Sequence, residues 1–590
     1  MIRLSKLHIK GAPLQGCNPH PFFRARQQDL AVAEGPGFPA DKRYSFGRET
    51  AFRVLPYKIQ DKYGRELKDL EFDTVVLEND FIRAEVIPSL GGRVWSLFDK
   101  VRGRDIVYRN PVFQPANLAI REAWFSGGIE WNIGHLGHSV HTCSPVFAGL
   151  VDDDTLRLWE YERQSGLQWS IDLSLAVDRP ILYAAVQVTN PDNYSKPLYW
   201  WTNTAVPETE DARVFSASSE VIYIVPGDGP KTMGGAVLPE LPTMPGEDAS
   251  YPAKFKYSNE YFFQNDRKRA HAKAQRRKEN YPWEAVVYND GYGFAECSTA
   301  PLIYRKMFCW GSGKGGRKWQ EFLSPREGLT ANHANHANHA NDSWTPYLEV
   351  QAGVAPTQLH TADIGAGETV SWVQAFSSIQ AEPVKAHDGD YEKAAGYVGE
   401  VVQERFKENP SPNPSRKGRG VSQPKVLFTG LDTSELITDK AALEYEAGDV
   451  DLAIRHWEEA LAKGEDPFVL RNLGYAYNEK GDKEKALQYY ERAYQLAPED
   501  ETIAKEYLTQ SRKDAKGFDI DIENLPEVLW PIAVKQLLCA FAPLRENLLN
   551  SLFSKQPCHI REGNNEMIEL WHQWKGADCE PPENIDFRMY

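Results

Sequence analysis

Residues 77–100 read LENDFIRAEVIPSLGGRVWSLFDK, and this stretch decides the fold. It contains two short runs in which apolar and polar residues alternate, FIRAEVIP (81–88) and RVWSLF (93–98). Alternation with a period of two predicts β-strands with one buried face. The paired glycines Gly91 and Gly92 lie between the runs and predict a turn. The stretch therefore predicts neighbouring antiparallel strands.

The same alternation continues along the chain, for example in LQWSIDLSLAV (167–177) and ILYAAVQVTN (181–190). Many short strands over about 300 residues predict a large antiparallel β-sandwich, here spanning residues 77–385. Residues 1–76 are predicted to form a smaller N-terminal β module packed on the sandwich. Helical periodicity is nearly absent before residue 390, so we expect all helices to lie after about residue 385.

Three segments depart from this pattern. RKRAHAKAQRRKEN (267–280) is strongly basic, and TANHANHANHAN (330–341) repeats Ala-Asn-His three times. Both are predicted to be surface inserts, because neither composition can bury a core. NPSPNPSRKGRG (409–420) is rich in Pro, Ser and Gly and predicts a linker. It lies within residues 386–430, which we assign to a helix followed by this linker.

The C-terminal part contains a helical repeat. Residues 467–500 read PFVLRNLGYAYNEKGDKEKALQYYERAYQLAPED, with Gly474, Ala486 and Ala493 at the small-residue positions of a tetratricopeptide (TPR) repeat. Residues 431–517 are therefore predicted to form TPR repeats that bind a protein partner. The tail, residues 518–590, permits no interpretation.

Composition narrows the class of protein. The chain has 590 residues, a formal net charge of −16 and seven cysteines, none of them in a CxxC pair. A phosphate backbone requires a basic surface, so nucleic acid is not an expected partner. The opening residues lack the apolar core of a signal peptide, and no stretch is apolar enough to span a membrane. We expect a cytoplasmic protein without a membrane partner.

Four stretches together resemble one family. They are residues 77–100, NPVFQPANLAIREAWFSGGIEWN (110–132), PLYWWTNTAVPETEDARV (197–214), and CWGSGKGGRKWQEFLS (309–324) followed by YLEVQAGVAPTQ (347–358). The resemblance is to the DUF5107 family, a domain of unknown function that often accompanies TPR repeats, and it covers roughly residues 40–380. The glycine-rich GSGKGG (311–316) is not a phosphate-binding loop, because it lacks the Gly-Lys-Ser/Thr ending and, we expect, a following helix.

A more distant resemblance is to galactose-mutarotase-like sandwiches, through the turn at Gly91-Gly92 and the strand that ends at Lys100. It implies a β-supersandwich fold and makes a sugar the leading ligand class. Mutarotases use a Glu as base and a His as acid. YLEVQ (347–351) is similar to the strand that carries that Glu, so the resemblance implies Glu349 as the base. The middle strand, YWWTN (199–203), contains no His. The acid would then come from His135, His138 or Glu130.

The stretch GGIEWNIGHLGHSVHTC (127–143) supplies those three candidates. Its histidines are open to three interpretations: zinc ligands, sugar contacts or an ordinary loop; we favour sugar contacts and predict no metal and no cofactor. Glycoside hydrolysis instead needs two carboxylates, for which Glu130 and Glu349 are the candidates. The neighbours of each carboxylate point to the opposite face of its strand, so both carboxylates can face one surface.

The remaining candidate ligand contacts are polar or aromatic residues of the same motifs: Arg93, Asn117, Trp131, Asn132, Trp201, Asn203 and Gln351. Three hypotheses follow. The chain is a carbohydrate-active enzyme, a glycoside hydrolase or sugar epimerase, with a TPR docking module. Alternatively it is a carbohydrate-binding protein without catalysis, or an adaptor that acts through its TPR repeats.

Overall fold

The computed structural model describes residues 1–16, 22–23, 32–47, 54–55, 57–134, 137–226, 230–264, 281–325, 346–407, 424–430, 441, 445, 449–462 and 464–514. The two predicted inserts, the predicted linker, the C-terminal tail and His135 lie outside these residues.

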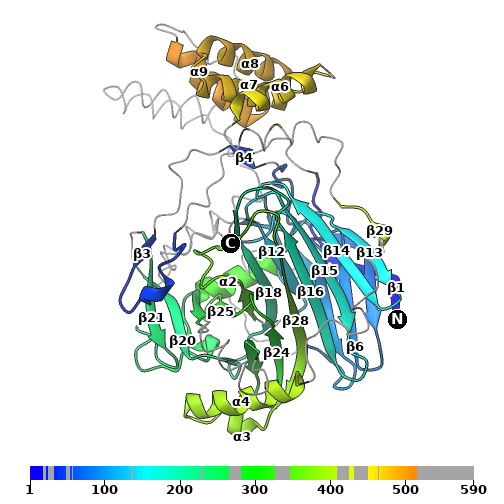
Figure 1. Ribbon diagram of the computed structural model, residues 1–590, viewed down its shortest axis with the longest axis vertical. Coiled ribbons are helices and arrows are strands. Elements are labelled where there is room, and N and C mark those ends of the chain that lie inside the picture. Colours follow the sequence, from blue (N-terminus) through cyan, green and yellow to red (C-terminus); the bar gives the residue numbers. More distant parts are fainter. Residues whose placement is uncertain are drawn as a thin grey trace.

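Two large β-sheets make up the main body of the protein (Figure 1). The larger sheet contains β1 (Ile2–Gly11), β3 (Val32–Glu34), β5 (Lys68–Glu78), β6 (Ile82–Ile87), β7 (Arg93–Asp99), β8 (Arg104–Asp105), β9 (Val112–Phe113), β12 (Ile129–Ile133), β18 (Trp200–Pro207), β20 (Glu220–Val225), β21 (Lys231–Val237), β22 (Asn259–Phe263), β25 (Tyr304–Cys309) and β26 (Tyr347–Gly353). The smaller sheet contains β13 (Phe147–Asp152), β14 (Thr155–Glu162), β15 (Leu167–Leu175), β16 (Ile181–Thr189), β19 (Arg213–Ser216), β23 (Trp283–Val287), β24 (Tyr292–Ser298), β28 (Thr369–Gln380) and β29 (Lys425–Phe428).

Three short strand pairs and several helices complete the described elements. The pairs are β2 (Phe22–Phe23) with β4 (Val54–Leu55), β10 (Ala116–Ala119) with β11 (Glu122–Trp124), and β17 (Lys196–Leu198) with β27 (Ala362–Ile364). The helices are α2 (Lys314–Leu323), α3 (Pro383–Ala386), α4 (Tyr391–Arg405), α6 (Val450–Leu461), α7 (Pro467–Glu479), α8 (Lys483–Leu496), α9 (Glu501–Asp514) and the 3₁₀ turns η2 (Ala40–Lys42) and η3 (Pro252–Lys254). None of the described helices combines the length and apolar character that a membrane crossing requires.

The two predicted strands of residues 77–100 are the antiparallel strands β6 and β7, and β6 also pairs with β5, which ends at Glu78. The turn before β6 is fixed by Asn79, whose side-chain oxygen accepts hydrogen bonds from the backbone N–H groups of Phe81 and Ile82. Gly91 and Gly92 both have positive φ angles, which glycine adopts without strain. A Cβ atom on Gly91 would lie 2.8 Å from the carbonyl oxygen of His141, so this turn requires glycine and packs against the His141 loop.

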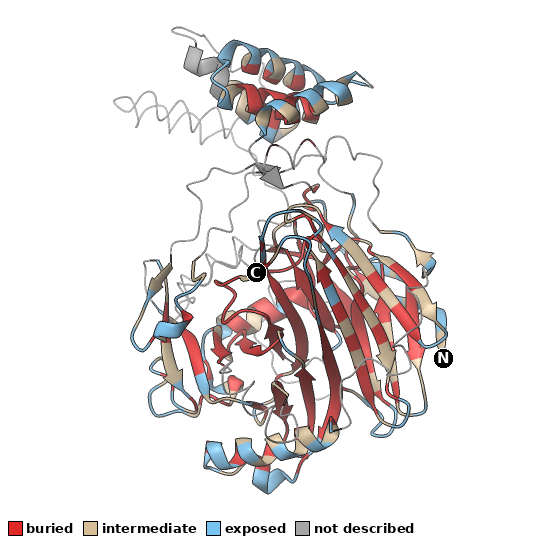
Figure 2. Cartoon of the chain, viewed as in Figure 1, coloured by how far each residue is buried: buried red, intermediate tan, exposed pale blue. Residues whose placement is uncertain are grey.

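The core lies between the two sheets and is built from inward-facing residues of both, such as Val94 and Ile129 from the larger sheet and Ile171 and Phe376 from the smaller one. Figure 2 shows buried residues running along the central strands of both sheets. Strands at the centre of such a body are covered on both faces, so their side chains are buried whether or not they are apolar. The fold class is therefore as predicted: a large antiparallel β-sandwich followed by TPR helices.

Two sequence-based expectations are corrected by the structure. Residues 314–323 form the helix α2, so helices do not all lie after residue 385, and GSGKGG does lead into a helix. Helix α2 was not predicted because Gly315 and Gly316 oppose helix formation and the segment has few apolar residues at helical spacing. The boundary predicted at residue 76 lies inside β5, and β1 pairs with β5 along its whole length. Strands β1, β3 and β5 therefore belong to the larger sheet, while β2 and β4 pair with each other.

Helix α4 packs on the sandwich. Its side chains Tyr391, Ala394, Val398 and Val402 join the same core as the two sheets. Asp390 caps the helix by accepting a hydrogen bond from the backbone N–H of Lys393, which satisfies one of the free donors of the first turn. The helix is thus part of the sandwich and precedes the predicted linker.

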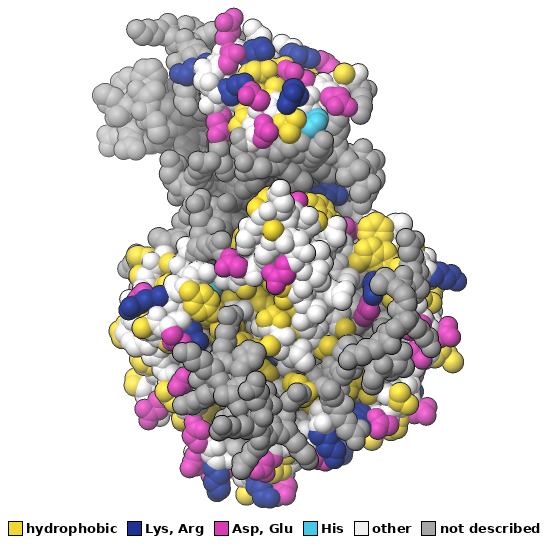
Figure 3. Space-filling model, viewed as in Figure 1, with side chains coloured by type: hydrophobic (Ala, Val, Ile, Leu, Met, Phe, Trp, Pro, Cys, Tyr) yellow, Lys and Arg dark blue, Asp and Glu magenta, His cyan; other side chains and the backbone are white. Residues whose placement is uncertain are grey.

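Helices α6–α9 form a helical unit with its own apolar contacts, which include Trp457, Leu473 and Tyr490. Gly474 in α7 lies against Tyr490 in α8, as the TPR pattern predicts, because a side chain at this position would separate the helices. Figure 3 shows acidic and basic side chains together on the outer surface of this unit. Such a surface is expected of helices whose apolar faces turn inward.

Replacing Gly474 with leucine is expected to unfold this helical unit partly. A Cβ atom at Gly474 would lie 2.9 Å from Cδ1 of Tyr490, and overpacking of this kind costs about 1–3 kcal/mol. Circular dichroism on heating should show an earlier loss of helical signal. Gly464→Ala is the matched control, because nothing lies within 4 Å of its Cβ position. Equal melting of the two variants would contradict the packing role of Gly474.

Candidate active site

Glu130 lies on β12, at the centre of the larger sheet. The strand register places Glu130 opposite Asn203 of β18, and Asn203 opposite Gln351 of β26. Neighbouring strands are about 4.8 Å apart, so Glu130 and Gln351 have Cα atoms about 10 Å apart on one face. Glu349 lies two residues from Gln351 and shares that face. The apolar neighbours of both carboxylates point into the core instead, as the sequence predicted.

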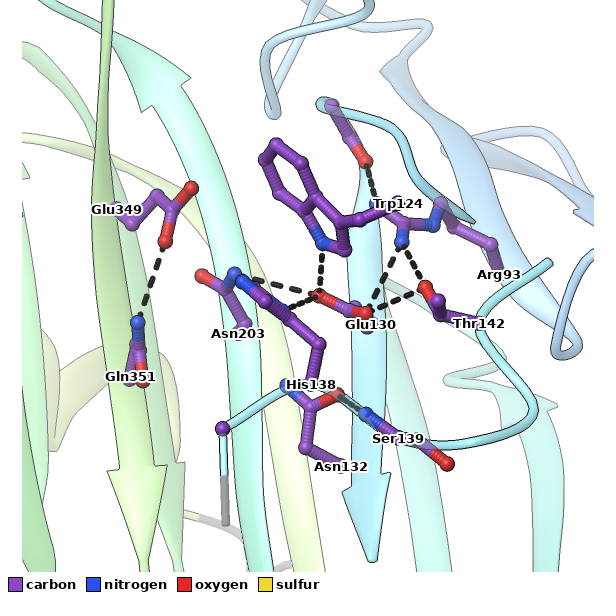
Figure 4. Close-up of polar contacts among 12 residues, drawn as sticks. Arg93, Trp124, Glu130, Asn132, His138, Ser139, Thr142, Asn203, Glu349 and Gln351 are labelled. Atoms are coloured by element: carbon purple, nitrogen blue, oxygen red, sulfur yellow. Dashed lines mark hydrogen bonds and ion pairs between the residues drawn. The ribbon is translucent and has the colours of Figure 1, made fainter. Parts of the chain in front are cut away.

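The Glu130 carboxylate accepts hydrogen bonds or ion pairs from five side chains (Figure 4). Oε2 is 2.9 Å from Nδ1 of His138 and 3.1 Å from Nε1 of Trp124. The other contacts are Asn203 Nδ2 at 3.4 Å from Oε2, Thr142 Oγ1 at 2.6 Å from Oε1, and Arg93 Nη2 at 3.2 Å from Oε1. Both oxygens of Glu130 are therefore already engaged within the protein.

These contacts keep Glu130 ionised. Burial alone would raise the pKa of the Glu130 carboxyl, but His138 and Arg93 beside it, with hydrogen bonds from His138 and Thr142, hold that pKa well below its ordinary value. A carboxylate that is ionised and saturated with donors is a poor proton donor. Its geometry suits it to orient the groups that surround it.

His138 is held between Glu130 and Trp124. Its Nδ1 meets the Glu130 carboxylate, and its ring lies 4.6 Å from the Trp124 ring, centroid to centroid. The loop that carries it is fixed by Asn132, whose Oδ1 accepts a 2.8 Å hydrogen bond from the backbone N–H of Ser139. Since an ionised carboxylate accepts only, Nδ1 carries the hydrogen and Nε2 is the nitrogen available for proton exchange.

Glu349 is the second carboxyl of this face. It is buried, and its Oε2 accepts a 3.2 Å hydrogen bond from Nε2 of Gln351. Burial raises the pKa of Glu349; His138 and Lys306 nearby lower it, and Glu130 raises it, with the balance above the ordinary value. A carboxylate with a raised pKa is a stronger base, which suits it to proton transfer near neutral pH.

Glu349 and His138 line one pocket. Its walls combine apolar or aromatic side chains with three ionisable groups: Leu118, Trp124, Phe308, Trp310, His138, Lys306 and Glu349. Apolar walls with a few converging polar groups are typical of a site that binds and orients a small polar ligand.

A family profile described as "Domain of unknown function (DUF5107)" matches residues 50–364, more than half of the chain. The chain belongs to this family. A tetratricopeptide repeat profile matches residues 438–501, which contain the helices α6, α7 and α8.

Similarity to solved structures extends over nearly the whole chain in one case. A TPR-domain-containing protein from Parabacteroides distasonis is 16% identical and aligns with a TM-score of 0.59 over 98% of this chain and 96% of that one. This likeness shows the fold. A putative aldose 1-epimerase from Escherichia coli aligns at 13% identity and a TM-score of 0.34 over 52% of this chain and 98% of that one. A galactose mutarotase-like protein from Clostridium acetobutylicum aligns at 10% identity and 0.35 over 52% and 96%.

Several predicted ligand contacts of this DUF5107 chain lie away from the pocket lining. Trp131 faces the core between the sheets and donates a 3.0 Å hydrogen bond to the carbonyl oxygen of Gly92. Trp201 is fully buried against Phe262 and offers no exposed platform. Asn117 is half-buried on β10, whose next residue, Leu118, reaches the pocket instead.

Other predicted contacts support the pocket indirectly. Arg93 and Asn203 contact Glu130, Asn132 fixes the loop of His138, and Gln351 contacts Glu349. Sequence reasoning missed Lys306 and the aromatic walls. A lysine in a strand normally indicates a solvated face, so YRKMFC (304–309) gave no sign that Lys306 is fully buried.

The surroundings of His141 do not favour a metal site. It is buried, and neither ring nitrogen has a hydrogen-bond partner. Burial, with Arg121 and Arg163 nearby, lowers the pKa of His141 to about 3, so the ring is neutral. Its ring packs instead against Tyr57 and Trp169. Within the described residues, no three His, Cys, Asp or Glu side chains come together as metal ligands.

Replacing His141 with leucine is expected to raise the free energy of unfolding. The change removes two buried nitrogen atoms without partners, each of which costs about 1–3 kcal/mol, while it keeps an apolar group in place. His138→Leu, three residues earlier, should instead lower stability because Glu130 loses a donor. Urea denaturation of the two variants makes the comparison. A large loss of stability in His141→Leu would contradict a purely packing role.

Proposed function

We propose that this pocket binds a single sugar ring and that Glu349 and His138 exchange protons with it. The observation that carries the proposal is that these two groups, from separate elements, line one aromatic-walled pocket. The faces of aromatic rings pack well against the apolar faces of sugars, and ionisable groups suit hydroxyl oxygens. The sequence resemblance of YLEVQ (347–351) to the Glu-containing strand of mutarotases agrees with this role for Glu349.

The chemistry that fits the two groups is acid–base catalysis at the anomeric centre of an aldose. Glu349, whose pKa is raised by burial, takes the proton of the anomeric hydroxyl. His138 gives a proton from Nε2 to the ring oxygen, which opens the ring, and reclosure on the other face yields the other anomer. The protons then return, so the reaction is balanced and needs no further reactant.

Glu130 has a positioning role in this proposal. Its carboxylate accepts from Nδ1 of His138, fixes the ring orientation and stabilises the imidazolium. Hydrolysis by two carboxylates is less favoured. Such a mechanism requires one protonated carboxyl and a second, ionised carboxylate with an oxygen free to attack the sugar or to activate water, and both oxygens of Glu130 are engaged by protein donors.

The TPR helices are proposed to dock a protein partner. This module has a separate core from the sandwich, so partner binding and sugar chemistry are assigned to different parts of the chain. Pull-down with the wild-type chain and with Gly474→Leu tests whether binding depends on packed TPR helices.

Polarimetry tests the enzymatic proposal directly. Single anomers of common aldoses are dissolved, and their approach to equilibrium is followed with and without the protein. Acceleration for one sugar supports acid–base catalysis. Calorimetric binding without acceleration favours the carbohydrate-binding hypothesis. Neither binding nor acceleration across the panel contradicts the proposal and leaves the adaptor hypothesis.

A further inference from the structure

A chain of hydrogen bonds leads to Glu349 from a lysine in the pocket wall. Lys306 lies on β25 and is fully buried. Its Nζ is 2.5 Å from Oε2 of Glu260, on the neighbouring strand β22, and donates a 2.6 Å hydrogen bond to Oε1 of Gln358. A buried ion pair adds little to stability because both charges are desolvated. Stability alone therefore does not explain why the Lys306–Glu260 pair lies beside the pocket.

The direction of the chain is set by the lysine. An ammonium group only donates, so Gln358 must present its carbonyl oxygen to Lys306. The amide nitrogen of Gln358 then donates to Oε1 of Gln351 at 3.1 Å. Gln351 in turn donates from Nε2 to Oε2 of Glu349 at 3.2 Å. The Lys306 ammonium thus fixes the orientation of the Gln358 and Gln351 amides. It thereby determines that Oε2 is the oxygen of Glu349 that accepts the hydrogen bond from Gln351.

The strand register brings the same groups together on one face. Lys306 lies opposite Gln351, and Phe308 lies opposite Glu349, so Lys306 and Glu349 are diagonal neighbours on adjacent strands. The ionisable groups that act on Glu349 are Lys306 from β25, Glu130 from β12 and His138 from the loop after β12; Tyr347 precedes it on β26. Figure 4 shows the second oxygen of Glu349 turned away from Gln351, on the side of Trp124.

We propose that Lys306, Gln358 and Gln351 are positioning residues that fix the Glu349 carboxyl and leave its proton-exchanging oxygen, Oε1, facing the pocket. The inference rests on the proposed catalytic role of Glu349. Oε2 accepts from Gln351 and is therefore the disfavoured oxygen for a proton. The exchangeable proton lies on Oε1, within the pocket where a sugar hydroxyl would bind. The positive charge of Lys306 also favours the ionised carboxylate, against the effect of burial.

The test measures the protonation of Glu349 without any substrate. Infrared spectra of the full chain are recorded across a pH series, and the spectrum of Glu349→Gln is subtracted, so that the carboxyl band of Glu349 is isolated. In Lys306→Met, the midpoint of this band is expected to move up by about one pH unit or more, the scale for loss of a nearby opposite charge. Lys306→Met combined with Glu260→Gln should show the same upward shift, which excludes an effect of the carboxylate left behind.

Two further variants complete the design. Lys196→Met is the matched control, because Lys196 is also a buried lysine paired with a carboxylate, Asp192, but does not line the pocket. It should leave the midpoint unchanged. Gln358→Met interrupts the chain without removing a charge and should raise the midpoint by less than Lys306→Met. If Lys306→Met does not fold, the midpoint of the Glu349 carboxyl band in Gln358→Met tests the inference by itself.

An unchanged midpoint in both Gln358→Met and whichever Lys306 variant folds would overturn the inference. An equal shift in Lys196→Met would overturn it too, because the effect would then be a general one of lost lysines. A shifted midpoint together with a negative sugar screen would contradict the proposed function and leave the positioning chain in place. The two proposals therefore fail separately.

Discussion

Glu349→Gln is expected to lower the turnover of any sugar that the protein interconverts by about 10²–10⁴-fold, the usual contribution of a general acid or base. Glutamine has nearly the same shape and can still contact Gln351, but it cannot take up a proton at the anomeric hydroxyl. Binding of the sugar should change much less. Polarimetric rates and calorimetric affinities of the wild-type and variant chains separate the two effects.

The same variant should not be destabilised above about pH 4.3, the ordinary pKa of a glutamic acid side chain. The folded-state pKa of Glu349 is raised, so its contribution to stability is fully present below the unfolded pKa and is lost as the pH rises through the folded pKa. The glutamine side chain in Glu349→Gln is neutral at every pH, so the variant does not lose this stability as the pH rises. Glu220→Gln, an exposed glutamate of the same sheet, is the control and should change neither rate nor stability. Full activity in Glu349→Gln would remove Glu349 from the mechanism.

The sandwich could be predicted because its signal is local. The alternation at residues 77–100 specifies which face of each strand is buried, and the structure places those strands side by side as expected. The same reasoning correctly separated the faces of β12 and β26, so that Glu130 and Glu349 share one side while Ile129 and Val350 enter the core. Period-two patterns fix faces without any knowledge of the partner strands.

What the sequence could not supply depends on contacts distant along the chain. Trp201 is on the same face as Asn203, yet it is covered by residues such as Phe38 and Met233, which come from far earlier and later segments. Helix α2 was missed because its glycines have a low helix propensity, and the short helix is stabilised by tertiary packing. The chain from Lys306 to Glu349 joins two separate segments, because Lys306 lies on β25 whereas Gln358, Gln351 and Glu349 lie within residues 347–358, so the sequence alone does not reveal it.

The roles within the opening motif also needed the structure. The sequence proposed Glu130, His135 and His138 as equivalent sources of a proton. Geometry distinguishes two of them, because Glu130 has both oxygens engaged by donors, whereas His138 lines the pocket and uses only Nδ1 to contact Glu130. His135 lies outside the described residues, so its role stays a prediction.

The second large effect is expected at Arg93. Arg93→Met should lower the free energy of unfolding by about 3–5 kcal/mol, the cost of breaking a buried ion pair by removing one partner. Arg93 is 2% exposed and donates to the carbonyl oxygen of Gly127 and to Thr142, each at 2.8 Å, besides its contact with Glu130. Methionine can fill much of the space against the Phe125 ring but leaves the Glu130 carboxylate without its cation.

A surface pair gives the control for this prediction. Arg3 and Glu78 also form an arginine–glutamate contact, at 3.4 Å, but their side chains are 46% and 29% exposed. Arg3→Met should therefore cost only about 0–1 kcal/mol, because water already screens the pair. Similar losses in both variants would show that burial of Glu130 does not decide the strength of the interaction.

The pH dependence of the Arg93 variant identifies the charge responsible. The folded-state pKa of Glu130 is depressed, so its contribution to stability is present above the unfolded value of about 4.3 and is lost as the pH falls through the folded pKa. Removal of Arg93 raises that folded pKa. The difference in stability between wild type and Arg93→Met should therefore narrow as the pH falls below about 4, where Glu130 becomes protonated first in the variant. Arg93→Met with Glu130→Gln should be more stable than Arg93→Met alone at neutral pH, because the unpaired buried charge is gone. If the double variant is no more stable, the loss comes from the hydrogen bonds to Gly127 and Thr142, and Glu130 is held in place by His138, Trp124 and Thr142 without need of the arginine.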